Sequence, residues 1–295
     1  MRRVRNPGIP DHLLTDPGPR TPEADLSPGA RERRKAIEHV EKWLRAGSPA
    51  GGPETFSYAV YSTKPVKAAL RAAFGAVCVY CETPYEAGQP MAVEHFRPKS
   101  GWQDDFKGKP AKPGYYWLAS TWENLLPACT RCNTGEWYVH RDGVRRKSGK
   151  GNVFPLAPGT RRAAAPGEER DETALLLHPY EDEPGEHLAF RADGSVQPAD
   201  TPAERKLPRG RSTIDVVGLN RPGLIDARTR VFIQVELFLR NAADFLEAER
   251  CVPAHLKPRM RSAYERNCEA LRDLARDGNP YCTMVRQLVP DEILK

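Results

Sequence analysis

Four cysteines form two pairs with the spacing of metal-binding turns. Cys78 and Cys81 make the first Cys-x-x-Cys pair, and Cys129 and Cys132 make the second. Each such turn presents two thiolates to one ion, and two turns complete the tetrahedron that Zn²⁺ prefers. Because four cysteines leave no open coordination position, we expect a structural zinc site. The alternative interpretation is four buried thiols without a metal.

The segment between the two cysteine pairs contains an acidic residue and a histidine at the end of an apolar run. In MAVEHFRPKS, Glu94 and His95 end a predicted strand ahead of Pro98. Asn124 lies shortly before the second cysteine pair, and Asn133 follows that pair directly. These polar side chains therefore come in a fixed order around the expected metal site.

This order resembles the motif of the HNH, or ββα-metal, endonucleases. CVYCE, VEHFRPKS, YYWLASTWENLLPACTRCN and FPL are together especially similar to the branch that includes PtuB, the nuclease subunit of Septu anti-phage systems. The resemblance covers residues 60–156 and continues more weakly to Arg228. It implies an α+β fold with a ββα-metal core on the four-cysteine zinc site. It also implies a partner ATPase resembling PtuA.

The resemblance assigns roles that the chemistry of these residues supports. His95 would be the general base that takes a proton from water. Glu94 and Asn133 would supply oxygen ligands for a catalytic Mg²⁺ or Mn²⁺. Asn124 would hold the His95 strand, with the His95 carbonyl as its expected partner. Alternatively, Glu94 only pairs with Arg97 and Asn133 only caps a turn.

The expected activity is hydrolysis of DNA phosphodiester bonds in an anti-phage system. An HNH nuclease that cleaves RNA, such as tRNA, is one alternative, because the metal and the base interact only with a phosphodiester. A zinc module that binds nucleic acid or protein without catalysis is another. A zinc site of two Cys-x-x-Cys pairs is compatible with a DNA nuclease, an RNA nuclease and a non-catalytic zinc module, so the cysteines alone do not distinguish these functions.

Basic residues are concentrated around this motif. From His95 to Arg162 there are 13 Lys or Arg and 5 Asp or Glu, a balance of 13 − 5 = +8, while the whole chain has a net charge of +6. Clustered cations bind phosphate backbones. One position departs from the HNH pattern, because Glu136 stands where the family commonly has a lysine. The predicted nucleic-acid contacts are Arg97, Lys99, Arg131, Arg145, Arg146 and Lys147.

The chain has few apolar residues and many breakers of regular structure. Apolar residues make up 39%, with 28 prolines and 23 glycines among 295 residues. We therefore expect much loop. The basic N-terminus is not followed by an apolar segment of the kind found in signal peptides, and no run reaches the ~18 apolar residues of a membrane helix. These features predict a cytoplasmic protein with no membrane contact.

Hydrophobic periodicity predicts the elements that position the site. We expect a proline-rich arm and a helix in residues 1–55, the nuclease domain in 56–165, and a mainly helical region in 166–295. The arm and the C-terminal helices are the expected partner-binding surfaces. Residues 141–165 should form a long loop. The predicted helices cover residues 28–47, 63–74, 221–253 and 255–276 with a short helix after them, and the predicted strands cover 173–180 and 186–196, with a turn at Asp193 and Gly194.

Overall fold

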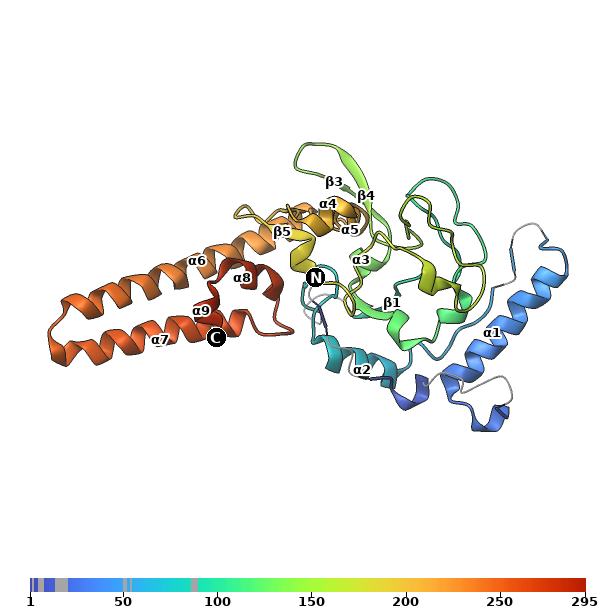
Figure 1. Ribbon diagram of the computed structural model, residues 1–295, viewed down its shortest axis with the longest axis horizontal. Coiled ribbons are helices and arrows are strands. Elements are labelled where there is room, and N and C mark those ends of the chain that lie inside the picture. Colours follow the sequence, from blue (N-terminus) through green and yellow to red (C-terminus); the bar gives the residue numbers. More distant parts are fainter. Residues whose placement is uncertain (2, 5–7, 14–20, 50–51, 54, 86–89) are drawn as a thin grey trace.

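The computed structural model describes residues 1, 3–4, 8–13, 21–49, 52–53, 55–85 and 90–295. Helices and short strands are mixed, as predicted for an α+β protein. A body of strands, loops and short helices lies between the long helix α1 at one end and a helical hairpin at the other (Figure 1). Among the described residues, no helix combines the length and apolar character needed to span a membrane.

Two helices precede the first cysteine pair, close to their predicted positions. They are α1, Pro28–Arg45, and α2, Lys64–Phe74. Ser27 caps α1 by accepting a hydrogen bond from the Ala30 backbone N–H at 3.1 Å, and Pro28 occupies the first helical position. Residues 14–20 of the predicted arm lie outside the described residues. Val4 and Leu13, within that arm, are buried in the core.

Strands β1 and β2 and the helix α3 form the centre of the body. Strand β1, Ala92–His95, pairs antiparallel with β2, Leu125–Ala128, so that His95 lies opposite Leu125 and Ala92 opposite Ala128. Helix α3, Thr130–Asn133, follows β2 directly. Two antiparallel strands and a short helix therefore follow one another around the second cysteine pair.

A β-hairpin replaces part of the predicted loop at residues 141–165, so that prediction is wrong for the first half of the segment. Strands β3, Glu136–Val139, and β4, Arg145–Ser148, pair antiparallel. Gly149 then turns the chain with φ = +100°, and a Cβ there would lie 2.2 Å from the Thr134 carbonyl oxygen. Only glycine fits this position without moving backbone.

The region after residue 166 also differs in part from the predicted pattern. Residues 173–180 form no named strand, and only Ala174 makes an isolated bridge, with Leu156. The segment 186–196 instead supplies a hairpin of β5, Leu188–Phe190, with β6, Val196–Pro198, which the Asp193–Gly194 turn connects. Helices α4, Pro202–Lys206, and α5, Arg209–Val217, were not predicted.

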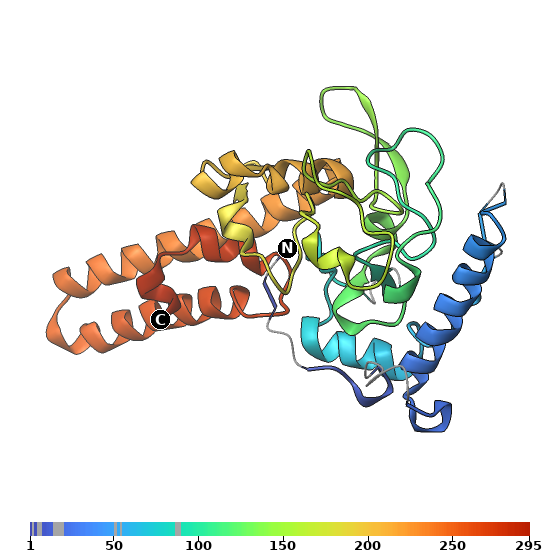
Figure 2. The ribbon, with the colours of Figure 1, turned by 45° about the vertical axis from the view of Figure 1, so that its right-hand side comes forward.

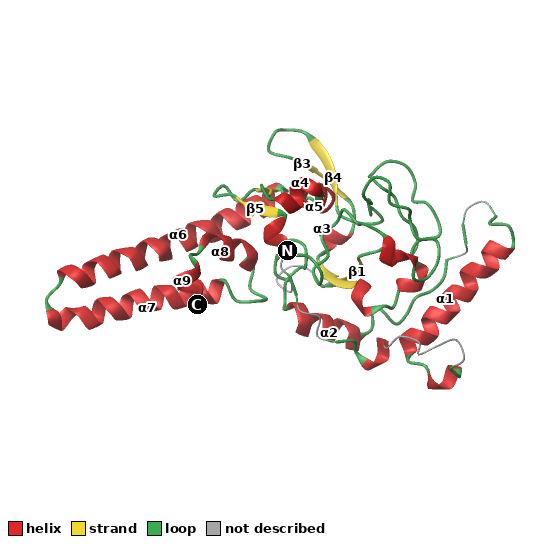
Figure 3. Cartoon of the chain, in the orientation of Figure 1, coloured by secondary structure: helices red, strands yellow, loops and turns green. Residues whose placement is uncertain are grey.

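The C-terminal helices confirm the predicted helical hairpin. The 30-residue helix α6, Pro222–Cys251, runs antiparallel to α7, Lys257–Leu274, and the short helices α8, Cys282–Leu288, and α9, Asp291–Leu294, lie against the hairpin (Figure 3). A small apolar cluster that includes Val235, Leu271 and Val285 joins them. Single turns of 3₁₀ helix occur at Asp11–Leu13, Glu23–Asp25, Tyr116–Leu118, Trp122–Asn124, Glu168–Asp171, Pro184–Glu186 and Ala254–Leu256.

The main core contains residues from all three predicted domains. One cluster of buried apolar side chains includes Val40 of α1, Trp117 and Phe154 near β2, and Leu177 and Leu224 beyond residue 166. The predicted domain boundaries at residues 55 and 165 stay a prediction. The buried residues from the three ranges nevertheless pack into one core.

Candidate metal and catalytic centre

The sulfur atoms of Cys78, Cys81, Cys129 and Cys132 form one buried cluster. All four lie within 4.8 Å of one another, and the Sγ atoms of Cys81 and Cys129 are 3.8 Å apart. A tetrahedron of sulfurs at about 2.3 Å from a metal has edges of roughly 3.8 Å. The donor set and its spacing therefore fit one tetrahedral metal ion.

Backbone hydrogen bonds attach the cysteine turns to the strands. The Val79 N–H, inside the first turn, donates to the Pro127 carbonyl of β2 at 2.9 Å. The second turn continues from β2 into α3, where the Cys132 and Asn133 N–H groups both donate to the Cys129 carbonyl at 3.0 Å. The pairing of β1 with β2 puts Ala92 opposite Ala128, next to Cys129, and Glu94 and His95 follow two and three residues farther along β1.

A cavity of about 390 Å³ lies next to the cysteine cluster, and Glu94, His95 and Asn133 all line it. The structure thus brings together the three predicted catalytic side chains. Glu94 and His95 are only 3% and 6% exposed, so both side chains lie at the buried end of the cavity wall. The remaining lining residues are Tyr61, Val93, Pro98, Lys99, Ser100, Thr134, Gly135, Gly151 and Asn152.

The hydrogen bonds of His95 select one of its nitrogens as a base. Its Nε2 lies 2.9 Å from the Ala119 carbonyl oxygen, which only accepts, so Nε2 carries the proton and donates. The lone pair of the neutral ring is then on Nδ1. Burial lowers the pKa of His95 well below 6.5, and the nearby cations Lys99 and Lys150 lower it further. The imidazole is therefore neutral at pH 7 and can accept a proton.

The two side chains that are predicted to bind a hard cation both line the cavity. Glu94 Oε1 is buried, and a lysine ammonium lies 2.7 Å from it. The Asn133 side chain makes no hydrogen bond within the described part of the chain, and its backbone carbonyl accepts from the Gly151 N–H at 2.8 Å. A carboxylate and an amide oxygen are donors that suit Mg²⁺ or Mn²⁺.

Lys150 is a site residue that the sequence did not single out. Its fully buried ammonium lies 2.7 Å from Glu94 Oε1 and donates to the His95 carbonyl at 2.7 Å. Burial raises the pKa of Glu94 and lowers that of Lys150, and their mutual attraction opposes both shifts. Lys150 is thus the partner of Glu94, in place of the Arg97 considered above.

Replacing Lys150 with methionine should lower the free energy of unfolding by about 3 kcal/mol, because it leaves a buried carboxylate and carbonyl without their partner. The loss should show in urea unfolding followed by circular dichroism. In the double variant Glu94→Gln/Lys150→Met the loss should be smaller than the sum of the two single losses. Additive losses would mean that the two side chains do not interact.

Asn124 holds the chain where it leaves β1. Its Oδ1 accepts from the Arg97 N–H at 2.7 Å, and its Nδ2 donates to the carbonyls of Arg97 and Leu118 at 3.0 and 3.1 Å. The expected partner was the His95 carbonyl, and that prediction is wrong because Lys150 occupies it. These bonds hold the backbone two residues after His95, and the role of Asn124 in positioning the His95 strand stays a prediction.

Substituting Asn124 with alanine should reduce the cleavage expected from the sequence at least tenfold and should not lower the metal content of the four-cysteine site, because it removes three hydrogen bonds of a buried side chain near His95. The measurement combines cleavage rate with metal content. Asn220→Ala is a matched control, since Asn220 exchanges the same pair of hydrogen bonds with the Val196 backbone, outside the cavity. Equal activity losses in both variants would show a general effect of destabilisation.

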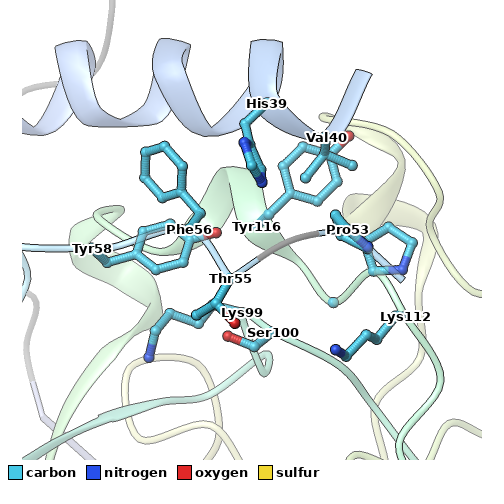
Figure 4. Close-up of a pocket in the computed structure, with 12 residues that line it drawn as sticks. His39, Val40, Pro53, Thr55, Phe56, Tyr58, Lys99, Ser100, Lys112 and Tyr116 are labelled. Carbon is cyan, nitrogen blue, oxygen red and sulfur yellow. The ribbon is translucent and has the colours of Figure 1, made fainter. Parts of the chain in front are cut away.

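Lys99 lines the cavity with Glu94 and His95, whereas Arg97 does not. Lys99 Nζ is 3.5 Å from His95 Nδ1 and 4.4 Å from the Tyr61 ring centroid. Lys99 also borders a pocket of about 80 Å³ beneath α1, where its amino group points away from His39 and Tyr116 (Figure 4). The Arg97 guanidinium donates to Glu172 Oε2 at 3.0 Å and to the Glu169 carbonyl at 3.1 Å. Arg97 is therefore engaged by the 169–172 segment and lies outside the cavity.

The other predicted phosphate contacts lie on or near the β3–β4 hairpin. Arg131 is largely exposed, and its Nε is 3.7 Å from Glu136. Glu136 also lies 3.9 Å from Arg221, whose guanidinium donates to Cys132 Sγ at 3.3 Å. Glu136 therefore contacts two arginines in this structure. Of the remaining three, Arg145 and Lys147 lie on one face of the hairpin and Arg146 on the other.

The chain is homologous to known bacterial proteins. It is 36% identical over 182 residues to the Septu protein PtuB of Bacillus mycoides (strain KBAB4), a match that covers 62% of this chain and 56% of PtuB. It is 26% identical over 161 residues to a retron Vc95 protein of Vibrio cholerae serotype O1 biovar El Tor, which is named as an HNH endonuclease. That match covers 55% of this chain and 60% of the relative. The resemblance to PtuB is therefore confirmed.

A third relative is the Septu protein PtuA of the same Bacillus strain. The identity is 27% over 160 residues, or 54% of this chain but only 20% of PtuA. The chain thus spans between a fifth and three fifths of the length of these relatives. No protein-family profile matches the chain. Of the three relatives, the retron protein is the one whose name supports a nuclease.

Proposed function

We propose that this homologue of PtuB is a metal-dependent HNH endonuclease that hydrolyses phosphodiester bonds, with β1, β2 and α3 as its ββα-metal core. The observation that carries the proposal is the single cavity lined by His95, Glu94 and Asn133 beside the four-cysteine cluster. In a module that served only to bind, nothing would require a neutral histidine and two oxygen donors to meet in one cavity.

Two metals would have separate tasks. Zinc is the metal that four closely spaced thiolates favour, and with its shell closed it would stabilise the fold. Glu94 and Asn133 would hold a Mg²⁺ or Mn²⁺ in the cavity. That cation would polarise the scissile phosphate and neutralise the charge that develops on it.

The residues of the chain would perform the proton transfer. His95 Nδ1 would accept the proton of the attacking water, while the hydrogen bond from Nε2 to Ala119 keeps the ring in its orientation. The Lys99 ammonium, 3.5 Å from Nδ1, would attract the phosphate into the cavity. Asn124 and Lys150 would hold the backbone on both sides of the histidine.

We further propose a role in a Septu-like anti-phage system with an ATPase partner that resembles PtuA. The homology to PtuB supports this role. The helical hairpin supplies a candidate surface for the partner, because Ile233 and Leu237 of α6 are 58% and 54% exposed and lie four residues apart on one face.

The function is tested by incubating the full chain with labelled DNA and with labelled RNA in Mg²⁺ or Mn²⁺, alone and with the product of the neighbouring gene. We expect cleavage of DNA. Cleavage of RNA alone would favour the alternative of an RNA-cleaving HNH enzyme. If neither substrate is cut in any of these mixtures, the zinc module without catalysis becomes the better interpretation.

A further inference from the structure

The two faces of the β3–β4 hairpin differ in their surroundings. Successive strand residues point to opposite faces, and the register pairs Trp137 with Lys147 and Val139 with Arg145. These four residues therefore share one face, which we call the outer face. Tyr138 and its partner Arg146 lie on the opposite, inner face.

The inner face is occupied by contacts within the protein. Arg146 forms two hydrogen bonds with the Asp142 carboxylate, at 3.0 and 2.6 Å. At the base of the hairpin, Ser148 packs so closely on Gly218 that a Cβ at that glycine would lie 2.4 Å from the Ser148 side chain. At the tip, Arg141 pairs with Asp226 of α6 at 2.8 Å. The hairpin is thus held against α5 and α6.

The outer face is open and combines an aromatic ring with cations. Trp137 and Val139 are each 58% exposed, and the Arg145 guanidinium lies 4.9 Å from the Trp137 ring centroid. Lys147 Nζ is 5.8 Å from the ring of Phe106, which lies on a neighbouring loop. The hairpin projects from the body of the protein in both orientations (Figures 1 and 2). The outer face therefore presents an exposed aromatic ring between two cationic side chains.

Both strands of the hairpin join the catalytic cavity directly. Thr134 and Gly135 line the cavity and lead into β3, while β4 leads through Gly149 to Lys150 and the lining residue Gly151. The Lys150 N–H donates to the Cys132 carbonyl at 2.8 Å, which fixes the hairpin to the metal cluster. Trp137 is two residues beyond Gly135, roughly 7 Å along the strand. The Trp137 ring therefore lies within the reach of a nucleic acid whose phosphate occupies the cavity.

We propose that the outer face binds single-stranded nucleic acid next to the scissile phosphate, with Trp137 stacking on an unpaired base and Arg145 and Lys147 contacting phosphates. The inference rests on the proposed nuclease function and narrows its substrate. An aromatic ring among cations suits single strands, because only an unpaired base offers its whole face for stacking. The local excess of positive charge complements a phosphate backbone.

The test measures the affinity of the full, zinc-loaded chain for a fluorescent single strand of about 20 nucleotides, a length of several binding sites, and for its duplex. A His95→Ala background prevents cleavage. Trp137→Ala should weaken single-strand binding about tenfold and reduce the preference over duplex. Arg145→Ala/Lys147→Ala should lower the salt slope by about 0.7 per lost contact. Arg146→Ala is the matched control on the inner face, and its affinity should stay close to that of the parent.

The inference is overturned if Trp137→Ala and Arg145→Ala/Lys147→Ala bind the strand as the parent does, or if Arg146→Ala weakens binding equally. It is also overturned if the Trp137 variant keeps its affinity for nucleic acid but loses a protein partner, since the face is then a protein interface. Cleavage with intact His95 is scored separately. If the variants with an altered outer face cleave at the rate of the parent protein, only this inference is refuted. If the protein binds single strands through the outer face but never cleaves them, only the proposed function is refuted.

Discussion

Replacing Cys129 with serine is expected to abolish binding of the proposed zinc and to unfold the body of the protein. The four sulfurs lie within 4.8 Å of one another, and the turns that carry them connect the first helices to β2 and α3. Binding of a structural zinc contributes about 10–16 kcal/mol in small metal-dependent domains. That is as large as the whole stability of a typical domain, about 5–15 kcal/mol. Zinc analysis and thermal unfolding would measure both effects.

Cys251→Ser provides the control, because Cys251 is an exposed cysteine at the end of α6. This variant should keep the zinc content and the melting temperature of the parent. A Cys129→Ser protein that remained folded without zinc would contradict a structural role for the metal. Buried thiols alone would then account for the cluster.

Replacing His95 with alanine is the second large prediction, and it concerns rate rather than folding. Loss of a general base should slow phosphodiester cleavage roughly 10³-fold, while the cysteine cluster retains its metal. Since burial lowers the pKa of His95, the parent should stay fully active as the pH falls to 6.5, and the acid limb of its pH–rate profile should lie below that value. Single-turnover cleavage across this pH range would show both effects.

His140→Ala is a suitable control because His140 is partly exposed and contacts Asp142 in the hairpin, at 3.2 Å. Its activity should match that of the parent across the same pH range. A His95→Ala protein with undiminished cleavage would remove the proposed base. An acid limb centred well above pH 6.5 would instead indicate that a different group titrates.

Much of the candidate site could be predicted from the order of residues along the chain. The cysteine pairs have the Cys-x-x-Cys spacing of metal-binding turns. The apolar run before Glu94 and His95 indicates a strand that ends at these two residues. Strand β2 pairs with β1 and leads into the second cysteine pair, so the chain that follows it can reach the cavity lined by Glu94 and His95. Asn133 follows because it is the next residue after Cys132.

Lys150 could not be predicted because its role depends on a distant contact. It lies 55 residues after His95, in a basic run that resembles a solvated loop, and a lysine is seldom buried without a partner. The one local signal was its position between Gly149 and Gly151, both of which adopt positive φ. Arg97 shows the opposite case, since its role as a partner of Glu172 depends on a segment 75 residues away.

The β3–β4 hairpin was missed for a related reason. Strands of four residues that carry several charges have little hydrophobic periodicity, and their pairing is stabilised by contacts with α5 and α6 that lie far along the chain. Trp137 was not considered because its exposure follows from that hairpin. The long helices α6 and α7, by contrast, have enough turns for their periodicity to determine them.

The most direct test of the two-metal nuclease is to titrate Mn²⁺ into the zinc-loaded chain while its zinc content and its cleavage of nucleic acid are followed on the same sample. We predict no cleavage with zinc as the only metal, cleavage that rises and saturates with added Mn²⁺, and an unchanged zinc content throughout. Full cleavage by the zinc-loaded chain without added metal would contradict the account. So would the absence of cleavage at every Mn²⁺ concentration, with and without the neighbouring gene product.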